Sequence, residues 1–238
     1  MDSKGWRHKL EARPLVADHP VALRVTLMLW FLGGVLFIAL QVPALRSAIQ
    51  AIDDGVHRLA VNLEFSPAVR MAVALDFLGS SWITFPLMAV VGLYLLRRRR
   101  WEGLVYWVLA MVFSQMMIGP IKTLYARPRP PMSLVETTSY SFPSGHAVAG
   151  AAIAIALVIV LVPAGPRRRN LEMIAAGFAV IMGLSRVYLR AHWLSDVVAG
   201  VALGAAVAIG VAVVMHYVVA ASGDQKASDR FEAEQPGV

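Results

Sequence analysis

Apolar runs of about 20 residues recur along the chain between short polar stretches, and a run of that length crosses a bilayer as a helix. Residues 46–70 are more polar, with apolar side chains at the helical spacing typical of an amphipathic interfacial helix. These side chains are Ile49, Ile52, Val56, Leu59 and Ala60. We therefore expect an all-α, polytopic membrane protein with six transmembrane helices and an interfacial segment between the first two. The predicted spans are 21–45, 71–96, 101–121, 146–162, 171–189 and 194–221.

The composition supports one membrane domain. Of the 238 residues, 58% are hydrophobic and only 16% are charged, a balance that ordinary soluble domains do not show. We predict a cytoplasmic segment over residues 1–20, a membrane domain over 21–221 and a disordered cytoplasmic tail over 222–238. The chain has no cysteine, which excludes disulfides, thiolate catalysis and cysteine metal sites.

The formal net charge of +7 points to a membrane rather than to nucleic acid, because the arginines cluster beside apolar spans. One cluster is Arg97–Arg100 and the other is Arg167–Arg169. Basic clusters of this kind remain in the cytoplasm and can contact anionic headgroups. We therefore expect a protein of the cytoplasmic membrane with both termini inside and the connections rich in histidine, serine and proline outside.

Small residues recur at four-residue spacing in two of the predicted spans. They are Gly150 and Ala154 after Gly145 in one span, and Gly200, Gly204 and Ala208 in the other. Small side chains let membrane helices approach closely. We therefore expect the fourth and sixth helices to pack tightly together.

The first segment with candidate chemistry places Lys122 seven residues before Arg129 and Pro130. Lysine and arginine beside a span often reach out to headgroups, and that reading would suffice for this segment alone. A proline-stiffened loop with two cations also suits phosphoryl oxygens, because arginine offers a planar fork and lysine a point charge.

The second segment is Pro143-Ser144-Gly145-His146, at the start of the fourth span. The serine could simply cap the helix. A helix start also exposes backbone N–H groups that bind anions, and the adjacent imidazole exchanges protons near neutral pH. Together these features favour a phosphate site beside an acid.

The third segment contains Ser185 and Arg186, then His192, then Asp196. If a helix begins near Ala191, the histidine and the aspartate lie one turn apart on the same face. The carboxylate could then accept one imidazole proton and leave the other ring nitrogen as a nucleophile. A pair that only stabilises the start of a helix is the alternative.

The predicted topology brings all three segments to one side of the membrane. Their combined pattern, K-x6-RP, PSGH and SR-x5-H-x3-D, resembles the signature of the type 2 phosphatidic acid phosphatase family, the membrane lipid phosphate phosphatases. Every signature position is matched between Lys122 and Asp196. Soluble acid phosphatases and vanadium haloperoxidases share this signature, and the six predicted spans favour the membrane branch.

The resemblance implies a phosphohistidine mechanism without a metal or cofactor. His192 would attack phosphorus, Asp196 would orient it, and His146 would protonate the leaving oxygen. The groups implied to bind the phosphoryl oxygens are Lys122, Arg129, Ser144, Gly145 and Arg186. The implied substrate is a phosphorylated membrane lipid, such as phosphatidate, phosphatidylglycerol phosphate or undecaprenyl diphosphate.

Three further residues attract attention. Arg127 could contact the substrate, lipid headgroups or Glu136, and Tyr188 could shape the mouth of the site. Asp76 interrupts the second span, where we expect a structural role at the outer interface. A lipid phosphotransferase with the same chemistry, or a non-catalytic transporter or scaffold, remains an alternative function.

Overall fold

The computed structural model describes residues 15–16 and 19–233, so most of the predicted N-terminal segment lies outside the described residues. All secondary structure within the described part is helical, which confirms the predicted all-α class. The eight helices there are α1 (His19–Ala39), α2 (Pro43–Asn62), α3 (Ser66–Leu78), α4 (Ser81–Arg97), α5 (Trp101–Tyr125), α6 (Gly145–Leu161), α7 (Pro166–Tyr188) and α8 (Leu194–Ala233).

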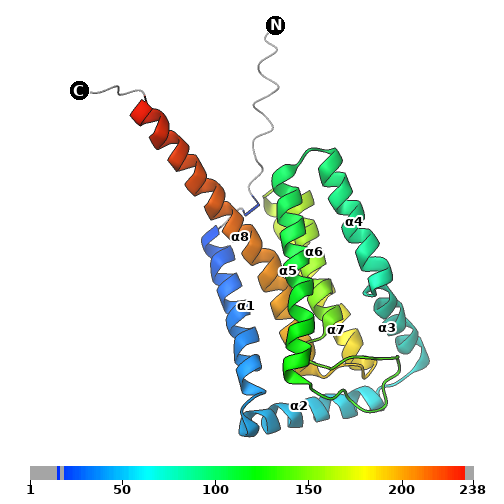
Figure 1. Ribbon diagram of the computed structural model, residues 1–238. Helices are drawn as coiled ribbons and strands as arrows, with labels where there is room; N and C mark the ends of the chain where they lie inside the picture. The colour runs from blue at the N-terminus through cyan, green and yellow to red at the C-terminus, as the bar shows by residue number, and fades with distance from the viewer. Residues whose placement is uncertain (1–14, 17–18, 234–238) are drawn as a thin grey trace.

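The helices form a bundle around α6, which packs against α5, α7 and α8, while α1 lies along α8 (Figure 1). The α2 helix runs across one end of this bundle. The long connection between α5 and α6 lies at that same end, and the start of α1 and the end of α8 lie toward the opposite end. The three sequence segments with candidate chemistry therefore gather beside α2.

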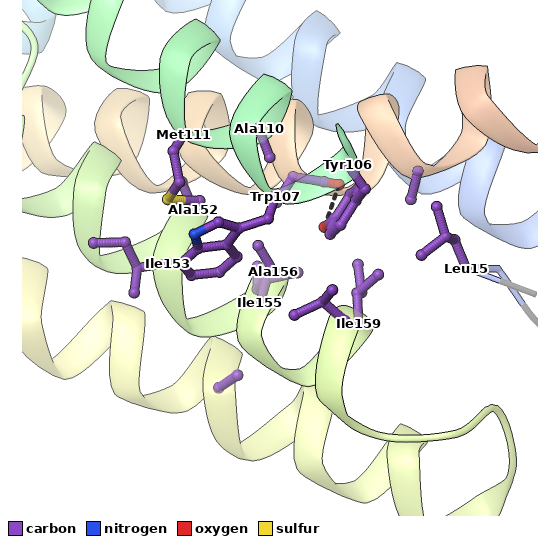
Figure 2. Packing of buried hydrophobic residues seen from close by; sticks show 14 of the residues in the cluster. Leu15, Tyr106, Trp107, Ala110, Met111, Ala152, Ile153, Ile155, Ala156 and Ile159 are labelled. Atoms are coloured by element: carbon purple, nitrogen blue, oxygen red, sulfur yellow. Dashed lines mark hydrogen bonds between the residues drawn. The ribbon is translucent and has the colours of Figure 1, made fainter. Parts of the chain in front are cut away.

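The core of the bundle is built mainly from alanine and β-branched residues of α6, packed against two aromatic side chains of α5. Trp107 and Tyr106 are almost completely buried, and they face Ala152 and Ala156 across a close helix contact (Figure 2). The Tyr106 hydroxyl donates a hydrogen bond of 2.9 Å to the Ala208 carbonyl of α8, which satisfies its polar atom. This core holds α5, α6 and α8 in fixed positions beneath the site.

The predicted close approach of the fourth and sixth spans is confirmed where α8 crosses α6. A Cβ atom on Gly204 would lie 2.2 Å from the Val148 carbonyl oxygen, and one on Gly200 would lie 2.8 Å from that of Ser144. Only glycine permits this backbone contact. On α6, however, Gly150 faces Met182 of α7, so the α6 surface that meets the α8 glycines is formed by Ala147, Val148 and Ala151.

The described helices account for most of the predicted spans. The helices α1, α5 and α7 and the part of α8 up to Val219 are each long and apolar enough to cross a membrane. The bent pair α3 and α4 would be a fifth crossing if it is one span, and α6 is apolar but only 17 residues long. Length and composition thus support four or five crossings.

The structure corrects the predicted straight span at 71–96. The chain there forms α3 and α4, which meet at an angle of 45°. Gly79 ends α3, and Ser80 is the extended residue that precedes α4. A glycine followed by a serine is a common helix stop and start, so the polar interruption near Asp76 is a real break in the helix.

Two other predicted boundaries also change. The amphipathic region is shorter than predicted, because α2 ends at Asn62 and residues 66–70 already belong to α3. On α2 the predicted apolar stripe is divided: Ile52 and Leu59 are exposed, whereas Ala60 is buried. The α8 helix continues to Ala233, beyond the predicted end of the last span.

Candidate active site

The third sequence segment lies in the tight connection between α7 and α8. Arg186 is in the last turn of α7, and its carbonyl accepts the backbone N–H groups of Ala191 and His192. Because α8 begins at Leu194 rather than near Ala191, His192 precedes the helix and Asp196 lies in its first turn. Asp196 reaches back and accepts the Trp193 N–H at 2.9 Å, as a first-turn carboxylate does in a capping box.

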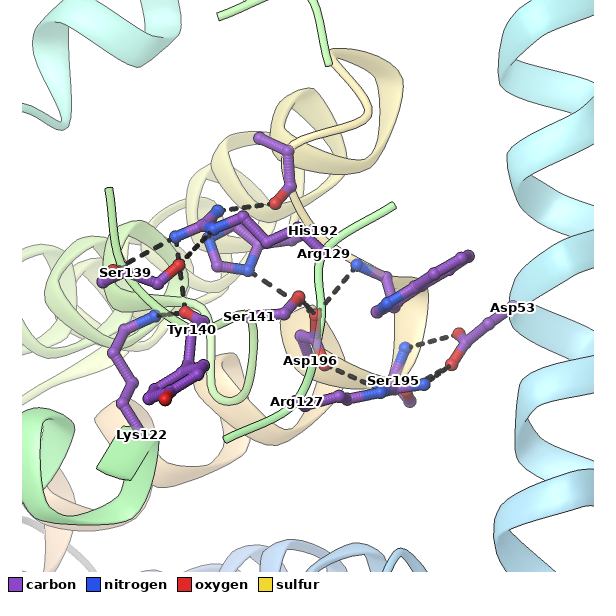
Figure 3. A network of polar contacts seen from close by, with 12 residues as sticks. Asp53, Lys122, Arg127, Arg129, Ser139, Tyr140, Ser141, His192, Ser195 and Asp196 are labelled. Atoms are coloured by element: carbon purple, nitrogen blue, oxygen red, sulfur yellow. Dashed lines mark hydrogen bonds and ion pairs between the residues drawn. The ribbon is translucent and has the colours of Figure 1, made fainter. Parts of the chain in front are cut away.

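The His192 ring lies between a carboxylate and a guanidinium. Its Nδ1 is 3.6 Å from Oδ2 of Asp196, and its Nε2 is 3.2 Å from Nη1 of Arg129 (Figure 3). Arginine can only donate hydrogen bonds, so the geometry favours a proton on Nδ1 and an unprotonated Nε2 whose lone pair faces Arg129. Burial lowers the pKa of His192 to about 4, with Asp196 acting in the opposite direction. Burial thus favours the neutral form of the imidazole.

The two cations of the first segment meet the loop before α6. Arg129 donates to the Ser139 carbonyl at 2.6 Å through Nε and to the Ala191 carbonyl at 2.6 Å through Nη1. Lys122 donates to the Tyr140 carbonyl. Burial, and then the nearby charge of Arg186, lowers the pKa of Arg129. A concentration of positive charge beside Nε2 of His192 favours the binding of an anion.

The second segment begins α6 directly beside Asp196. Ser144 is the extended residue before the helix, and its backbone N–H donates to the Asp196 carbonyl at 3.1 Å. Its Oγ atom is buried and has no hydrogen-bond partner among the described residues. An unpaired buried hydroxyl at a helix start is suited to an anionic ligand, because the first turn also exposes backbone N–H groups.

His146 lies on the side of the site formed by α3. Its Nε2 is 3.0 Å from Oδ1 of Asp76, and the same oxygen accepts a hydrogen bond from Arg186. A Cβ atom on Gly79 would lie 2.5 Å from the His146 ring, so glycine at the α3–α4 break gives the imidazole its space. Asp76 therefore contacts two of the candidate site residues, which goes beyond the structural role at the interface that we expected.

The two secondary candidates contact α2 and its connection to α3. Arg127 points away from the candidate phosphate ligands (Figure 3). Its guanidinium is buried between the carboxylates of Asp196 and of Asp53 of α2, and it forms an ion pair with each. The Tyr188 hydroxyl donates to the Leu63 carbonyl at 3.0 Å, and this hydrogen bond joins the end of α7 to the α2–α3 connection.

Sequence reasoning missed Asp53 and Ser141. The Ser141 hydroxyl donates to Oδ2 of Asp196, although no signature position includes it. Asp53 was overlooked because residues 46–70 were read as a membrane-surface helix. A carboxylate on the inner face of such a helix, at helical spacing from Gln50 and Ala60, was the available signal.

Comparison with known proteins agrees with this geometry. The model of the PAP2 superfamily matches residues 103–220, which contain all three segments. Phosphatidylglycerophosphatase B of Bacillus subtilis is 30% identical over 174 residues, covering 71% of this chain and 85% of that protein. The chain belongs to the PAP2 superfamily.

Two further similar proteins extend the comparison. The crystal structure of a transmembrane PAP2 type phosphatidylglycerolphosphate phosphatase from Bacillus subtilis has a TM-score of 0.69 at 28% identity, covering 78% of this chain and 93% of that chain. A decaprenylphosphoryl-5-phosphoribose phosphatase of Mycobacterium tuberculosis is 36% identical over 149 residues, covering 57% of this chain and 74% of that protein. PAP2 lipid phosphatases hydrolyse phosphoesters without a metal ion, and this chain is a membrane enzyme of that class.

Proposed function

We propose that this enzyme removes a phosphate group from a membrane lipid through a covalent phosphohistidine on His192. The observation that carries the proposal is the placement of this ring: it is buried, with Nδ1 3.6 Å from the Asp196 carboxylate and Nε2 3.2 Å from the Arg129 guanidinium. A neutral imidazole nitrogen that faces a cluster of cations can attack a phosphorus atom without prior loss of a proton.

The chemistry proceeds in two balanced steps. In the first, the Nε2 lone pair forms a bond to phosphorus, and the bond from phosphorus to the lipid oxygen breaks. The leaving oxygen takes a proton from His146, whose Nε2 lies 3.0 Å from Oδ1 of Asp76. In the second step, His146 removes a proton from water, the resulting hydroxide attacks phosphorus, and the bond to His192 breaks to release inorganic phosphate.

The phosphoryl oxygens would be held by groups from all three segments. Lys122, Arg129 and Arg186 supply the positive charge, while Ser144 and the Gly145 N–H supply neutral donors at the start of α6. Phosphoryl transfer depends mainly on in-line placement and on preset charge around the transferred group. The unpaired Oγ of Ser144 and Nε of Arg186 support this assignment, because buried donors without a partner in the protein can donate to a bound ligand.

We further propose six crossings, with α6 and the bent pair α3–α4 each spanning the bilayer and with the site on the outer face. In support, Arg100 donates to the Val160 carbonyl at 2.7 Å and Arg168 donates to the Leu15 carbonyl, so both arginine clusters lie at the bundle end opposite the site (Figure 1). Basic clusters mark the cytoplasmic side.

This topology can be tested directly because the chain has no cysteine of its own. We expect Thr138→Cys, in the exposed loop before α6, to react with a membrane-impermeant maleimide in intact spheroplasts. Asn170→Cys, near the start of α7, should react only after the membrane is permeabilised. Reaction of the second variant in sealed spheroplasts would reverse the proposed orientation.

The function is tested by measuring phosphate release from purified enzyme in detergent with excess chelator. The panel contains phosphatidate, phosphatidylglycerol phosphate and undecaprenyl diphosphate. We expect release from at least one lipid at the same rate with and without chelator, because fixed cations take the place of a metal. Activity that chelator abolishes and magnesium restores would contradict the proposal. Transfer of the phosphate to an added acceptor lipid, with none released, would identify a phosphotransferase.

A further inference from the structure

A buried ion pair lies directly behind Asp196 and has no part in the two proposed steps. It joins Asp53 of α2 to Arg127, with 2.8 Å between Oδ2 and Nη2. The side chains are 1% and 9% exposed, respectively. The other nitrogen of the same guanidinium, Nη1, lies 2.7 Å from Oδ1 of Asp196. Arg127 thus bridges two carboxylates, and only one of them contacts His192.

The arrangement fixes the direction in which Asp196 points. Its Oδ1 is held by Arg127, and its Oδ2 accepts the Ser141 hydroxyl and the Trp193 N–H. Oδ2 is also the atom nearest to Nδ1 of His192. A carboxylate held on both oxygens cannot rotate away from the imidazole, so the ring keeps its tautomer.

Asp53 also joins α2 to the start of α8. Its Oδ1 accepts the Ser195 backbone N–H at 2.9 Å, and its Oδ2 accepts the Ser195 hydroxyl at 2.6 Å. Gln50, one turn earlier on α2, accepts a further hydrogen bond of 2.7 Å from Arg127. Figure 3 shows Asp53 entering this network from a helix separate from the one that carries Asp196.

The net charge of this network bears on the stability of the phosphohistidine. When His192 bonds to phosphorus at Nε2 and keeps its proton on Nδ1, the ring becomes a cation. Asp196 paired with Arg127 alone would be neutral and would stabilise that cation poorly. The second carboxylate, Asp53, changes the net charge of the group. Asp53, Arg127 and Asp196 together carry one negative charge, and it lies close to the ring.

We infer that Asp53 and Arg127 are positioning residues for the nucleophile, and this inference rests on the proposed function of His192. Asp53 acts through Arg127: it neutralises the guanidinium and holds it in place, so that Asp196 keeps its orientation and its charge for the imidazolium. The α2 helix is thereby part of the catalytic apparatus, although it carries no residue of the PAP2 signature.

The test compares Asp53→Asn with the matched control Asp54→Asn, the adjacent carboxylate. Asp54 accepts a hydrogen bond of 2.8 Å from Gln50, which asparagine can also accept, and it forms no ion pair with Arg127 among the described residues. On the best lipid of the panel, we expect Asp53→Asn to lower kcat by about 100-fold with KM within about threefold, as for a misplaced reacting group. The control should keep the wild-type kcat. Should Asp53→Asn fail to fold, Arg127→Lys replaces it, because lysine keeps the charge but cannot bridge both carboxylates.

A double-mutant cycle separates positioning from a merely structural role. If Asp53 acts through Asp196, adding Asp53→Asn to Asp196→Asn should cost less than about threefold further in kcat. Equal losses in both backgrounds, or a wild-type kcat in Asp53→Asn, would overturn the inference while leaving the proposed function intact. A wild-type enzyme that is silent on every lipid would overturn both.

Discussion

Replacement of His192 by alanine is expected to abolish phosphate release, with a loss on the order of 10⁴-fold or more in kcat. The reason is that no other described histidine has one ring nitrogen beside Arg129 and the other beside the Asp196 carboxylate. Without His192, water would have to attack phosphorus directly, without the fixed position that the protein gives the imidazole. Brief reaction with ³²P-labelled lipid followed by acid-free gel separation should show a labelled protein band in the wild type and none in the variant.

His216→Ala is the matched control for this experiment. His216 lies toward the far end of α8, where its ring stacks on His19 at 4.8 Å, and no site residue contacts it in the described structure. We expect wild-type activity and labelling from this variant. Labelled protein from His192→Ala would show that another residue carries the phosphoryl group, and the proposed mechanism would then be wrong.

The second large effect is expected from Asp196→Asn, which should lower kcat by about 10³- to 10⁴-fold with little change in KM. Asparagine keeps the size of the side chain but removes the charge that stabilises the imidazolium. It also places an NH₂ group where an oxygen now accepts hydrogen bonds, facing either Arg127 or the donors Ser141 and Trp193. Initial rates over a range of lipid concentrations separate kcat from KM.

Glu172→Gln is a suitable comparison for Asp196→Asn. Glu172 pairs with Arg168 at the opposite end of the bundle, so its loss removes a carboxylate from an ion pair without touching the site. A kcat of Asp196→Asn within tenfold of the wild type would show that Asp196 is not needed to orient His192. A large rise in KM with an unchanged kcat would instead make Asp196 part of the binding of the ground state.

Much of the fold was predictable because a bilayer imposes strict demands on length and polarity. Apolar runs located most helices within a few residues, and glycines at four-residue spacing indicated the contact between α6 and α8. The exceptions arose where polarity was ambiguous. Asp76, Gly79 and Ser80 could equally have marked a membrane interface or a break, and the 45° angle between α3 and α4 shows the break.

The candidate site shows the same division. Residues adjacent in the signature, such as Ser144 and His146, could be found from spacing because they share one helix start. The Asp53–Arg127 pair joins residues 74 positions apart, and nothing in either local pattern connects them. Contacts of this kind depend on how α2 docks against the α5–α6 connection, which sequence periodicity does not encode.

The backbone contact between α6 and α8 also bears on how such a chain can diversify. Gly200 and Gly204 set the spacing between the start of α6 and the turn that holds His192, independently of the loop over residues 131–138, which precedes the carbonyls that hold Lys122 and Arg129. Substitutions, insertions and deletions in that loop can therefore accumulate without shifting the nucleophile relative to the anion-binding helix start. A lineage can explore new lipid headgroups at the mouth of the site while the bond-breaking geometry is inherited unchanged.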